Sequence, residues 1–402
     1  MVMRIVFAMA GALVFGTASS ENVTPGFNTL IPESILTPDS VETSIGTLNF
    51  FDGLPDEETV TKVYDNLDRV RATQAFLDMV PLASIEGLRR GMESVGVDAS
   101  HKILLYNDLM DSNSLFLTGN TDTIYALGML DLQRDGATVV EIPPGAGPGT
   151  VNDAYFRFVI DMGAPGPDRG KGGKYLILPP GYEGEVPEGY FSVESPTYVN
   201  WLPLRGFLKD GKTDAAVDMW TKGLKIYPLS KKDNPPKLEV INGTGIIMNT
   251  VHANDETFFE EIAEVIQREP LEFLDDELRG NLASIGIEKG KEFAPDARMR
   301  AILKDGVAIA NATARALAFR PRSETIYIYG EESAWFTAFD GGSYQWLLND
   351  GNGGRNRDAR TVFFYIATVN TPAMVLQMIG AGSQYALAAL DSKGRYLDGA
   401  KD

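Results

Sequence analysis

Hydrophobic residues recur at helical spacing in two stretches of the chain and at strand spacing in two others. The first helical stretch begins after Asp56, a residue of the type that caps helices, and has apolar residues every three or four positions from Val60 to Val70. Pro81 interrupts this pattern because proline lacks a backbone N–H. The spacing then resumes around Leu88, so the pattern predicts two helices rather than one.

The β-rich stretch lies between about 101 and 205. Its short runs of β-branched and aromatic residues are separated by clusters of glycine and proline, such as Pro143-Pro-Gly145. The predicted strands are 123–130, 138–142, 155–160, 174–178 and 197–204. Short strands with turn signals at this spacing predict an antiparallel sandwich or barrel.

Helical spacing returns between about 206 and 320. Asn254 and Asp255 precede a run in which Phe258 and Ile266 share one face, and a second, alanine-rich helix is predicted over 295–319. Beyond it the pattern predicts strands again, at 325–329, 361–367 and 383–390. The order of helices, sandwich, helices and sheet has no repeating strand–helix–strand unit, which excludes a doubly wound or TIM-barrel fold.

The first twenty residues have the three parts of an export signal. A positive start that includes Arg4 precedes an apolar run over 5–15, and small polar residues follow up to Ser20. The alternative is an ordinary buried helix. The pattern predicts cleavage after Ala18 or Ser20 and a secreted or periplasmic protein. No later stretch reaches about eighteen apolar residues, so no membrane span is expected.

Composition removes several classes of function. The chain has a net charge of −19, which argues against binding to nucleic acid phosphates or anionic membranes. Two histidines and no cysteine leave no His/Cys zinc cluster, and no Gly-x-Ser-x-Gly motif of serine esterases occurs. Neither a metal nor a cofactor is therefore expected.

The first candidate site is a turn that opens a predicted strand. Asp122 is the candidate general acid or base, Asn120 an orienting amide, and Tyr125 a further catalytic candidate. The alternative is that Asn120 and Asp122 only form hydrogen bonds within the turn.

Four further candidates have a binding or catalytic role as one of their interpretations. Arg169 and Lys174 lie in or beside a glycine-rich loop that either approaches a ligand or is simply solvated. The three arginines from Arg355 to Arg360 either clamp a carboxylate or sulfate or pair with neighbouring acids. His252 is either a base or a structural residue. The last candidate is a set of aromatic residues that either form a platform for sugars or pack in the core: Tyr344, Trp346, Trp335 and Tyr365.

Several of these motifs resemble a known family. Asn120-Thr-Asp-Thr-Ile-Tyr125 and the later Lys171-Gly-Gly-Lys174 with the Leu-Pro-Pro that follows are similar to the family called domain of unknown function 1254. The segment from Glu331 to Gly399, which begins Glu331-Glu-Ser-Ala-Trp335, is similar to the start of its usual companion, domain of unknown function 1214.

The resemblance implies an immunoglobulin-like β-sandwich, a helical insert and a jelly-roll-like C-terminal domain. In that family the chain continues past Leu397-Asp-Gly399 with further strands, so the C-terminal domain is expected to be incomplete. The predicted fold class is therefore multidomain α+β. Its segments are a signal peptide (1–20), a lead-in with helices (21–100), the sandwich (101–205), a helical region (206–320) and the incomplete jelly-roll-like domain (321–402).

Two functions follow from these patterns. The first is a hydrolase that acts on an extracellular glycan or ester, with Asp122, Asn120 and Tyr125 as catalytic residues. Its substrate-binding residues are expected to be Arg169, Lys174, Arg360 and Tyr344. The second is a non-catalytic carbohydrate-binding or surface-interaction protein, whose ligand is a small molecule or a carbohydrate. Two carboxylates about 5–10 Å apart in a cleft would favour the first, and an aromatic surface without such acids would favour the second.

Overall fold

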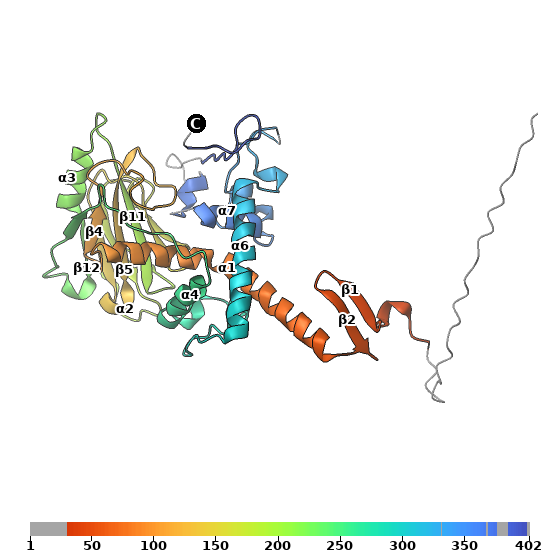
Figure 1. The fold of residues 1–402 in the computed structure, drawn as a ribbon. Helices are drawn as coiled ribbons and strands as arrows, with labels where there is room; N and C mark the ends of the chain where they lie inside the picture. The colour runs from red at the N-terminus through yellow and green to blue at the C-terminus, as the bar shows by residue number, and fades with distance from the viewer. Residues whose placement is uncertain (1–29, 331, 367–368, 376–384, 400–402) are drawn as a thin grey trace, which may run out of the picture. The chain divides into compact units, whose positions relative to one another are not determined.

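The computed structural model describes residues 30–330, 332–366, 369–375 and 385–399 (Figure 1). The predicted signal peptide lies outside these residues. The chain divides into two compact units, residues 1–64 and 65–402. Within the part of the chain that is described, no helix is both long enough and apolar enough to cross a membrane.

The described part of the first unit is a small antiparallel sheet. A short 3-10 helix, η1 (Glu33–Ile35), precedes the three strands β1 (Ser40–Thr43), β2 (Gly46–Phe51) and β3 (Leu54–Pro55). Glycines with positive φ, Gly46 and Gly53, stand at the two turns between these strands. The sheet was not anticipated from the sequence, because its strands are short and mostly exposed.

Helix α1 (Glu57–Ser94) is continuous over 38 residues. Pro81 lies inside it, so the predicted division into two helices is wrong. The residues on either side of the proline, Val80 and Leu82, are almost completely buried in the core. This packing offsets the hydrogen bond that proline cannot donate, which local spacing alone does not reveal.

Two mixed sheets dominate the second unit. The larger has the order β13-β4-β5-β11-β7-β8, and only its β13–β4 pair is parallel. Its strands are β4 (Lys102–Leu105), β5 (Thr123–Asp131), β7 (Gly149–Asp153), β8 (Phe158–Met162), β11 (Val199–Phe207) and β13 (Glu239–Asn242). The smaller has the order β10-β9-β6-β12, with β10 parallel to β9. Its strands are β6 (Thr138–Ile142), β9 (Gly173–Leu178), β10 (Phe191–Glu194) and β12 (Lys225–Pro228).

The two sheets share one hydrophobic core. Ile124 and Leu202 of the larger sheet and Val140 and Ile177 of the smaller belong to the same buried cluster, which Trp220 of α3 (Asp214–Gly223) completes. The β-rich character predicted for 101–205 is therefore confirmed, and neither sheet is closed into a barrel. The family-specific immunoglobulin-like topology stays a prediction.

The predicted strand 155–160 is divided between a corner and the first residues of β8. Asp153 ends β7 and Phe158 begins β8, and Phe156 between them has a positive φ of 62°. The aromatic residues of this run resemble a strand in sequence, but the left-handed residue turns the chain so that β7 and β8 pair with each other.

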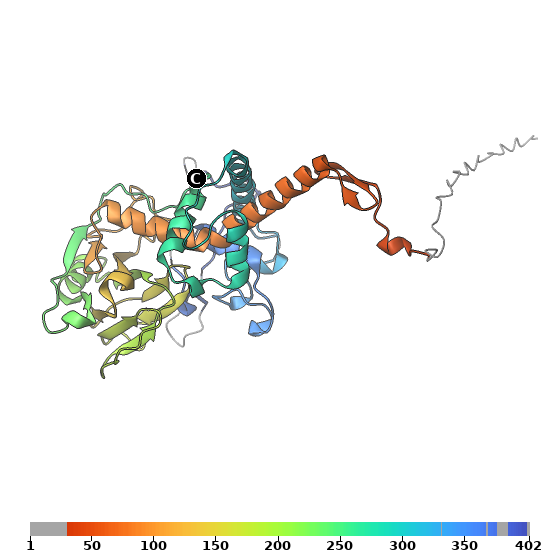
Figure 2. The same cartoon turned by 90° about the horizontal axis from the view of Figure 1, so that it is seen from below.

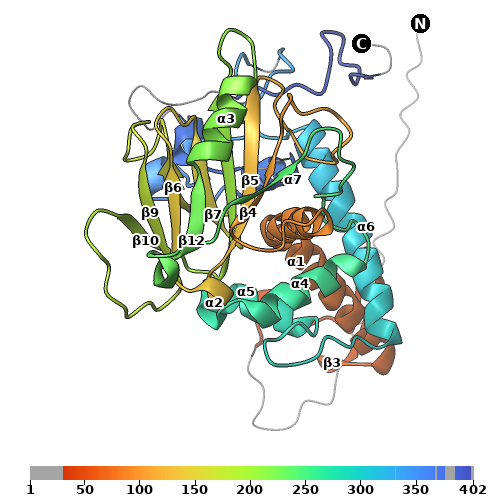
Figure 3. The same cartoon turned by 90° about the vertical axis from the view of Figure 1, so that its left-hand side faces the viewer.

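Helices, among them α1, α4 (Thr257–Arg268) and α6 (Ala297–Phe319), cover the other face of the larger sheet. Leu127 and Trp201 of that sheet form a core with Phe76 of α1 and Phe258 of α4. Figure 3 shows α1, α4 and α6 on this side of the strands, and the same separation of strands and helices is visible from below in Figure 2. The α-helices of this unit besides α1 and α3 are α2 (Leu132–Asp135), α4 (Thr257–Arg268), α5 (Asp276–Ser284), α6 (Ala297–Phe319) and α7 (Arg357–Ile366).

The strands predicted for the C-terminal region are not observed. The predicted strand 361–367 overlaps α7, in which Ala359, Val362 and Phe363 are buried on one face and the Asn356 side chain accepts a hydrogen bond from the Ala359 N–H. Segment 325–329 begins in a 3-10 turn, and residues 383–384 lie outside the described part.

Within the described residues of 321–402, β-structure is limited to isolated bridges such as Phe336 to Leu387, so the expected jelly-roll-like sheet is not seen there. The 3-10 helices of the second unit are η2 (Leu229–Lys231), η3 (Leu271–Phe273), η4 (Glu324–Ile326), η5 (Asp340–Gly342), η6 (Asn349–Gly351) and η7 (Pro372–Val375).

Candidate functional site

The predicted acid/base turn has the hydrogen bonds of a structural turn. The Asn120 Oδ1 atom accepts from the backbone N–H groups of Asp122 (3.1 Å) and Thr123 (2.9 Å), and Asn120 Nδ2 donates to the Tyr125 hydroxyl (2.6 Å). Tyr125 is buried, with the Arg205 guanidinium 5.5 Å from its ring centre. The Asp122 carboxylate is exposed and has no hydrogen bond or ion pair with any described residue. Its catalytic role stays a prediction.

The glycine-rich loop is folded around a buried acid. The Asp168 carboxylate accepts hydrogen bonds from the N–H groups of Gly163 (2.8 Å) and Gly172 (3.1 Å) and from the Tyr175 hydroxyl. Arg169 is exposed on this loop, and Lys174 forms an ion pair with Glu141 at 3.5 Å on the smaller sheet. These contacts place Arg169 and Lys174 apart from the cavity described next.

Arg360 and Tyr344, in contrast, line the same cavity of about 250 Å³. It is formed by the β7–β8 corner, the loop at 344–346, the start of α7 and residue 370. Its other polar side chains include Tyr155, Arg157 and Arg355. No aspartate or glutamate lines it, although the chain contains 55 acidic and 36 basic residues. Three arginines therefore converge without a lining acid.

Arg360 is fixed from behind by α1. Its Nη2 atom donates to the Tyr155 hydroxyl (2.7 Å) and to the Asp78 carbonyl (3.2 Å), and Nη1 lies 3.5 Å from the Asp78 carboxylate. The Tyr155 hydroxyl in turn donates to the same carbonyl (2.8 Å). Arg357 binds both carboxylate oxygens of Asp78 at 2.7 and 2.8 Å. The Asp78 carboxylate thus forms ion pairs with two arginines.

Arg157 has an unused donor. Its Nε binds the buried Asp153 carboxylate at 2.6 Å and its Nη1 donates to the Phe273 carbonyl at 2.9 Å. Its Nη2 atom is buried and has no partner among the described residues. Asn370 Oδ1, at the same cavity, is likewise buried and unpartnered. A buried donor or acceptor without a hydrogen-bond partner lowers the stability of the fold by about 1–3 kcal/mol. This cost disappears when another group supplies the partner.

Arg355 completes the positive wall. Burial and the nearby charges of Arg360 and Arg157 lower the pKa of its guanidinium below the usual value. No carboxylate of a described residue lies within ion-pair distance of it. The sequence had left open whether these arginines clamp an anion or pair with acids. Arg357 and Arg360 pair with Asp78, whereas Arg355 is available to a ligand.

The aromatic residues divide between cavity and core. The rings of Tyr344 and Phe158 form a T-shaped contact with their centroids 5.9 Å apart. Tyr344 lies in the cavity wall, where burial raises the pKa of its hydroxyl. Trp346 is buried, and its indole N–H donates to the Ala338 carbonyl at 2.9 Å. Trp335 is exposed and lines none of the cavities described here. Of the proposed aromatic platform, Tyr344 and Trp346 therefore line the cavity, beside Phe158.

His252 belongs to the core. Its ring makes T-shaped contacts with the rings of Phe76 and Phe258, at centroid distances of 6.2 and 5.4 Å, and its Nδ1 is 2.8 Å from the Ala253 carbonyl oxygen. Burial lowers the pKa of this imidazole. These contacts are those of a neutral, structural histidine.

Sequence reasoning missed Asp161. This residue of β8 is 4% exposed, and both carboxylate oxygens lie within hydrogen-bond distance of the Thr371 hydroxyl, at 2.7 and 2.8 Å. Burial raises the pKa of Asp161 to about 6. It lines a narrow cavity of about 50 Å³ together with Arg205 and Tyr385. A single acid inside the apolar run Phe158-Val-Ile-Asp-Met162 was the signal that could have identified it.

Metal binding finds no support in the described part of the chain. There, no group of three or more histidines and acids has a geometry that could hold a metal ion.

Comparison with known proteins gives one similar solved structure and one family that matches part of the chain. No curated protein matches the chain. The structure is similar to the crystal structure of the VPA0106 protein from Vibrio parahaemolyticus, with a TM-score of 0.51 and 18% identity over 83% of this chain and 74% of that one. At this identity the likeness concerns the fold alone. Residues 102–228, which include the predicted motif from Asn120 to Tyr125, match the family described as protein of unknown function (DUF1254).

Proposed function

We propose that the protein binds a small carboxylate-bearing ligand, of the class of uronic acid sugars, in the cavity lined by Arg157, Arg355 and Arg360. The observation that carries this proposal is the convergence of three guanidinium groups on a cavity that no acid lines. Arg355 supplies an unpaired charge, and Arg157 supplies a buried donor without an acceptor. A carboxylate would provide both the negative charge and the missing acceptor.

The chemistry of the wall favours a carboxylate on a ring. A planar guanidinium binds a carboxylate through two parallel hydrogen bonds, which a neutral hydroxyl cannot reproduce. Tyr344 and Phe158 offer apolar surface to the body of the ligand, and the unpartnered Asn370 Oδ1 would accept a hydrogen bond from a sugar hydroxyl. The volume of about 250 Å³ is near the lower limit of small-molecule sites, so it suits one sugar unit.

The negative net charge of the chain does not prevent this binding. Charges more than about 10 Å apart are largely screened at moderate salt, so the nearby arginines determine the local field. Binding is then expected to weaken as the salt concentration rises.

Ligand binding without catalysis is the form of the proposal that the cavity favours. The nearest acids behind its wall, Asp78 and Asp153, are both engaged by arginines, and no pair of free carboxylates lines it. We therefore favour a carbohydrate-binding role over hydrolysis. Together with the expected export signal, this points to an anionic glycan outside the cytoplasm as the source of the ligand.

Calorimetric titration with glucuronate and with glucose tests the proposal. Glucuronate is expected to bind at least tenfold more tightly than glucose, and Arg355→Gln is expected to remove most of that difference, because a charged hydrogen bond contributes about 1.5–3 kcal/mol. Arg300→Gln is the matched control, since Arg300 is exposed on α6 and forms no ion pair with a described residue.

Two results would overturn the proposal as a whole, and a third would overturn the class of ligand. One is equal affinity for glucuronate and glucose. The other is an Arg355→Gln variant that binds glucuronate as tightly as the Arg300→Gln control does. Inorganic sulfate serves as a third ligand: if it binds as tightly as glucuronate, the site recognises charge alone and the sugar class is wrong.

A further inference from the structure

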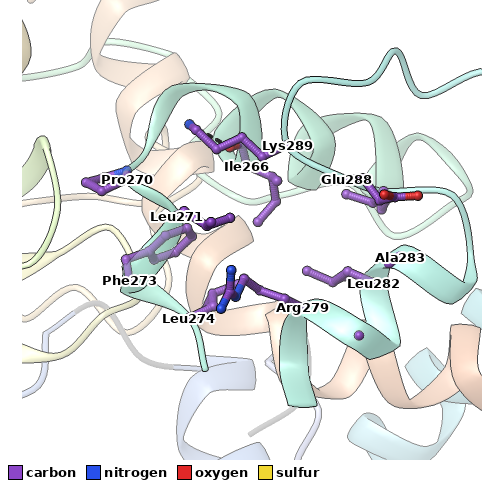
Figure 4. A pocket seen from close by; sticks show the side chains of 12 residues that line it. Ile266, Pro270, Leu271, Phe273, Leu274, Arg279, Leu282, Ala283, Glu288 and Lys289 are labelled. Carbon is purple, nitrogen blue, oxygen red and sulfur yellow. Dashed lines mark hydrogen bonds between the residues drawn. The ribbon is translucent and has the colours of Figure 1, made fainter. Parts of the chain in front are cut away.

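A second cavity of different chemistry lies among the helices, independently of the proposed sugar site. It has a volume of about 280 Å³ and is formed by the end of α4, by η3, by α5 and by the loop that follows (Figure 4). Its floor is apolar and almost completely buried, and consists of Ile266, Phe273, Leu274, Leu282 and Ile287. Such a cavity can bind the apolar part of a ligand against these side chains.

Arg279 brings an unsatisfied donor to this cavity. Its Nη2 atom forms an ion pair with Asp276, which is almost fully exposed, but its Nε atom is buried and has no acceptor among the described residues. In Figure 4 the Arg279 guanidinium extends toward Phe273 and Leu274 at the edge of the cavity. A ligand with an acceptor at its polar end would satisfy this N–H.

The other charges at the rim do not oppose an anion. The Lys289 ammonium donates to the carbonyls of Gln267 (2.9 Å) and Glu269, at the end of α4. Glu288 is paired with Lys291 at 2.7 Å. The charges of Arg279 and Glu288 are each balanced by an ion pair, whereas Lys289 binds only neutral carbonyl groups. The rim therefore has a small positive net charge.

Gly280 gives an independent indication that the cavity is kept open. It lies in the middle of α5, where glycine is unfavourable, yet its φ is not positive and a Cβ atom would meet nothing within 4 Å. Neither backbone geometry nor close packing therefore requires glycine here. Gly280 does line the cavity, where a larger side chain would occupy the space of a ligand.

We propose that this cavity binds a medium-chain aliphatic carboxylate, with the hydrocarbon chain on the apolar floor and the carboxylate on the Arg279 Nε–H. At about 30 Å³ for each water-sized group, the cavity of about 280 Å³ accommodates about nine such groups, close to the size of octanoate. Each buried methylene strengthens binding about fourfold. The carboxylate is preferred over an alcohol because it forms a charged hydrogen bond with Arg279.

Calorimetric titration of the full chain with octanoate, hexanoate and octanol tests both parts of the proposal. Octanoate is expected to bind roughly 15-fold more tightly than hexanoate, since it has two more methylenes, and about tenfold more tightly than octanol. Arg279→Gln is expected to abolish the preference for octanoate over octanol, whereas Arg300→Gln is expected to retain it.

Filling the cavity provides the second test. Gly280→Leu is expected to weaken octanoate binding at least tenfold while circular dichroism shows an intact fold. Ala301→Leu, which enlarges an exposed residue of α6, is the control for an added apolar side chain. Unchanged octanoate affinity in a folded Gly280→Leu variant would overturn the location of the site. If that variant fails to fold, the Arg279→Gln comparison still decides, because an unaltered preference for octanoate over octanol would refute the proposed contact.

Discussion

Replacement of Glu86 by glutamine should show how much a single buried acid stabilises the junction of α1 and α4. The Glu86 side chain is completely buried, and its carboxylate binds Arg89 (2.7 Å), Arg90 (3.0 Å) and Arg268 (2.9 Å). Burial opposes ionisation of this acid, but the hydrogen bond from Arg89 and the charge of Arg268 outweigh it. Together they lower the pKa of Glu86 to about 2.

The magnitude follows from the pKa difference between the unfolded and the folded chain. A fall from 4.5 to about 2 corresponds to roughly 3 kcal/mol, at 1.36 kcal/mol for each pKa unit. Because the folded-state pKa is lowered, this stabilisation is fully present above about pH 4.5 and is lost as the pH falls toward 2. At pH 3 about half of it, roughly 1.5 kcal/mol, should remain.

The assay is denaturant unfolding of the wild type and of Glu86→Gln at pH 7 and pH 3. We expect the variant to lose about 3 kcal/mol of unfolding free energy at pH 7 and about half as much at pH 3. Glu93→Gln is the matched control, since Glu93 binds only Arg89 and is half exposed, so its loss should stay within about 1 kcal/mol. A loss at Glu86 that is no greater than the loss at Glu93, or that does not change with pH, would refute the reasoning.

Three further outcomes are expected. Asp161→Asn should stabilise the fold above pH 6, because the raised pKa of Asp161, about 6 against 3.8, makes the wild type lose about 2.4 kcal/mol as the pH rises from 4 to 7. Parallel pH-dependent unfolding curves for the two proteins would contradict this. Gly280→Ala should raise the unfolding free energy by about 0.5–1 kcal/mol through helix propensity, and an unchanged or lower melting temperature would refute it. Gly91→Ala in α1 should destabilise the fold by roughly 1–3 kcal/mol, because the new Cβ would lie 2.4 Å from the Asn249 carbonyl oxygen. A melting temperature equal to that of the wild type would show that the loop around Asn249 moves away easily.

The sequence revealed local structure best where neighbouring residues determine it. The strand predicted at 138–142 coincides with β6, and the helix predicted after Asp255 is α4, because turn glycines and helix caps act over a few residues. Residues 361–367 were assigned to a strand because β-branched and aromatic residues predominate there. The packing of α7 against the rest of the core outweighs that preference, and only Asn356 signalled a helix.

The candidate site could be anticipated in part. Arg360 and Tyr344 were singled out by residue type, and the structure brings them to one cavity. Arg157 was missed because it lies about two hundred residues away in the sequence, and no periodicity connects it to α7. Its i+4 relation to Asp153 is visible in the sequence, but it resembles an ordinary ion pair.

The contacts of Asp78 have a consequence for biosynthesis. This residue of α1 binds Arg357 and Arg360, which follow it by 279 and 282 residues, and its carbonyl accepts a hydrogen bond from Tyr155. A nascent chain can pair β5 with β11 once about 207 residues have emerged from the ribosome, but the arginine-lined cavity requires α7 as well. The cavity is therefore assembled only after residues 355–370 have been translated, and a chain released before Arg360 would contain both sheets but no anion site.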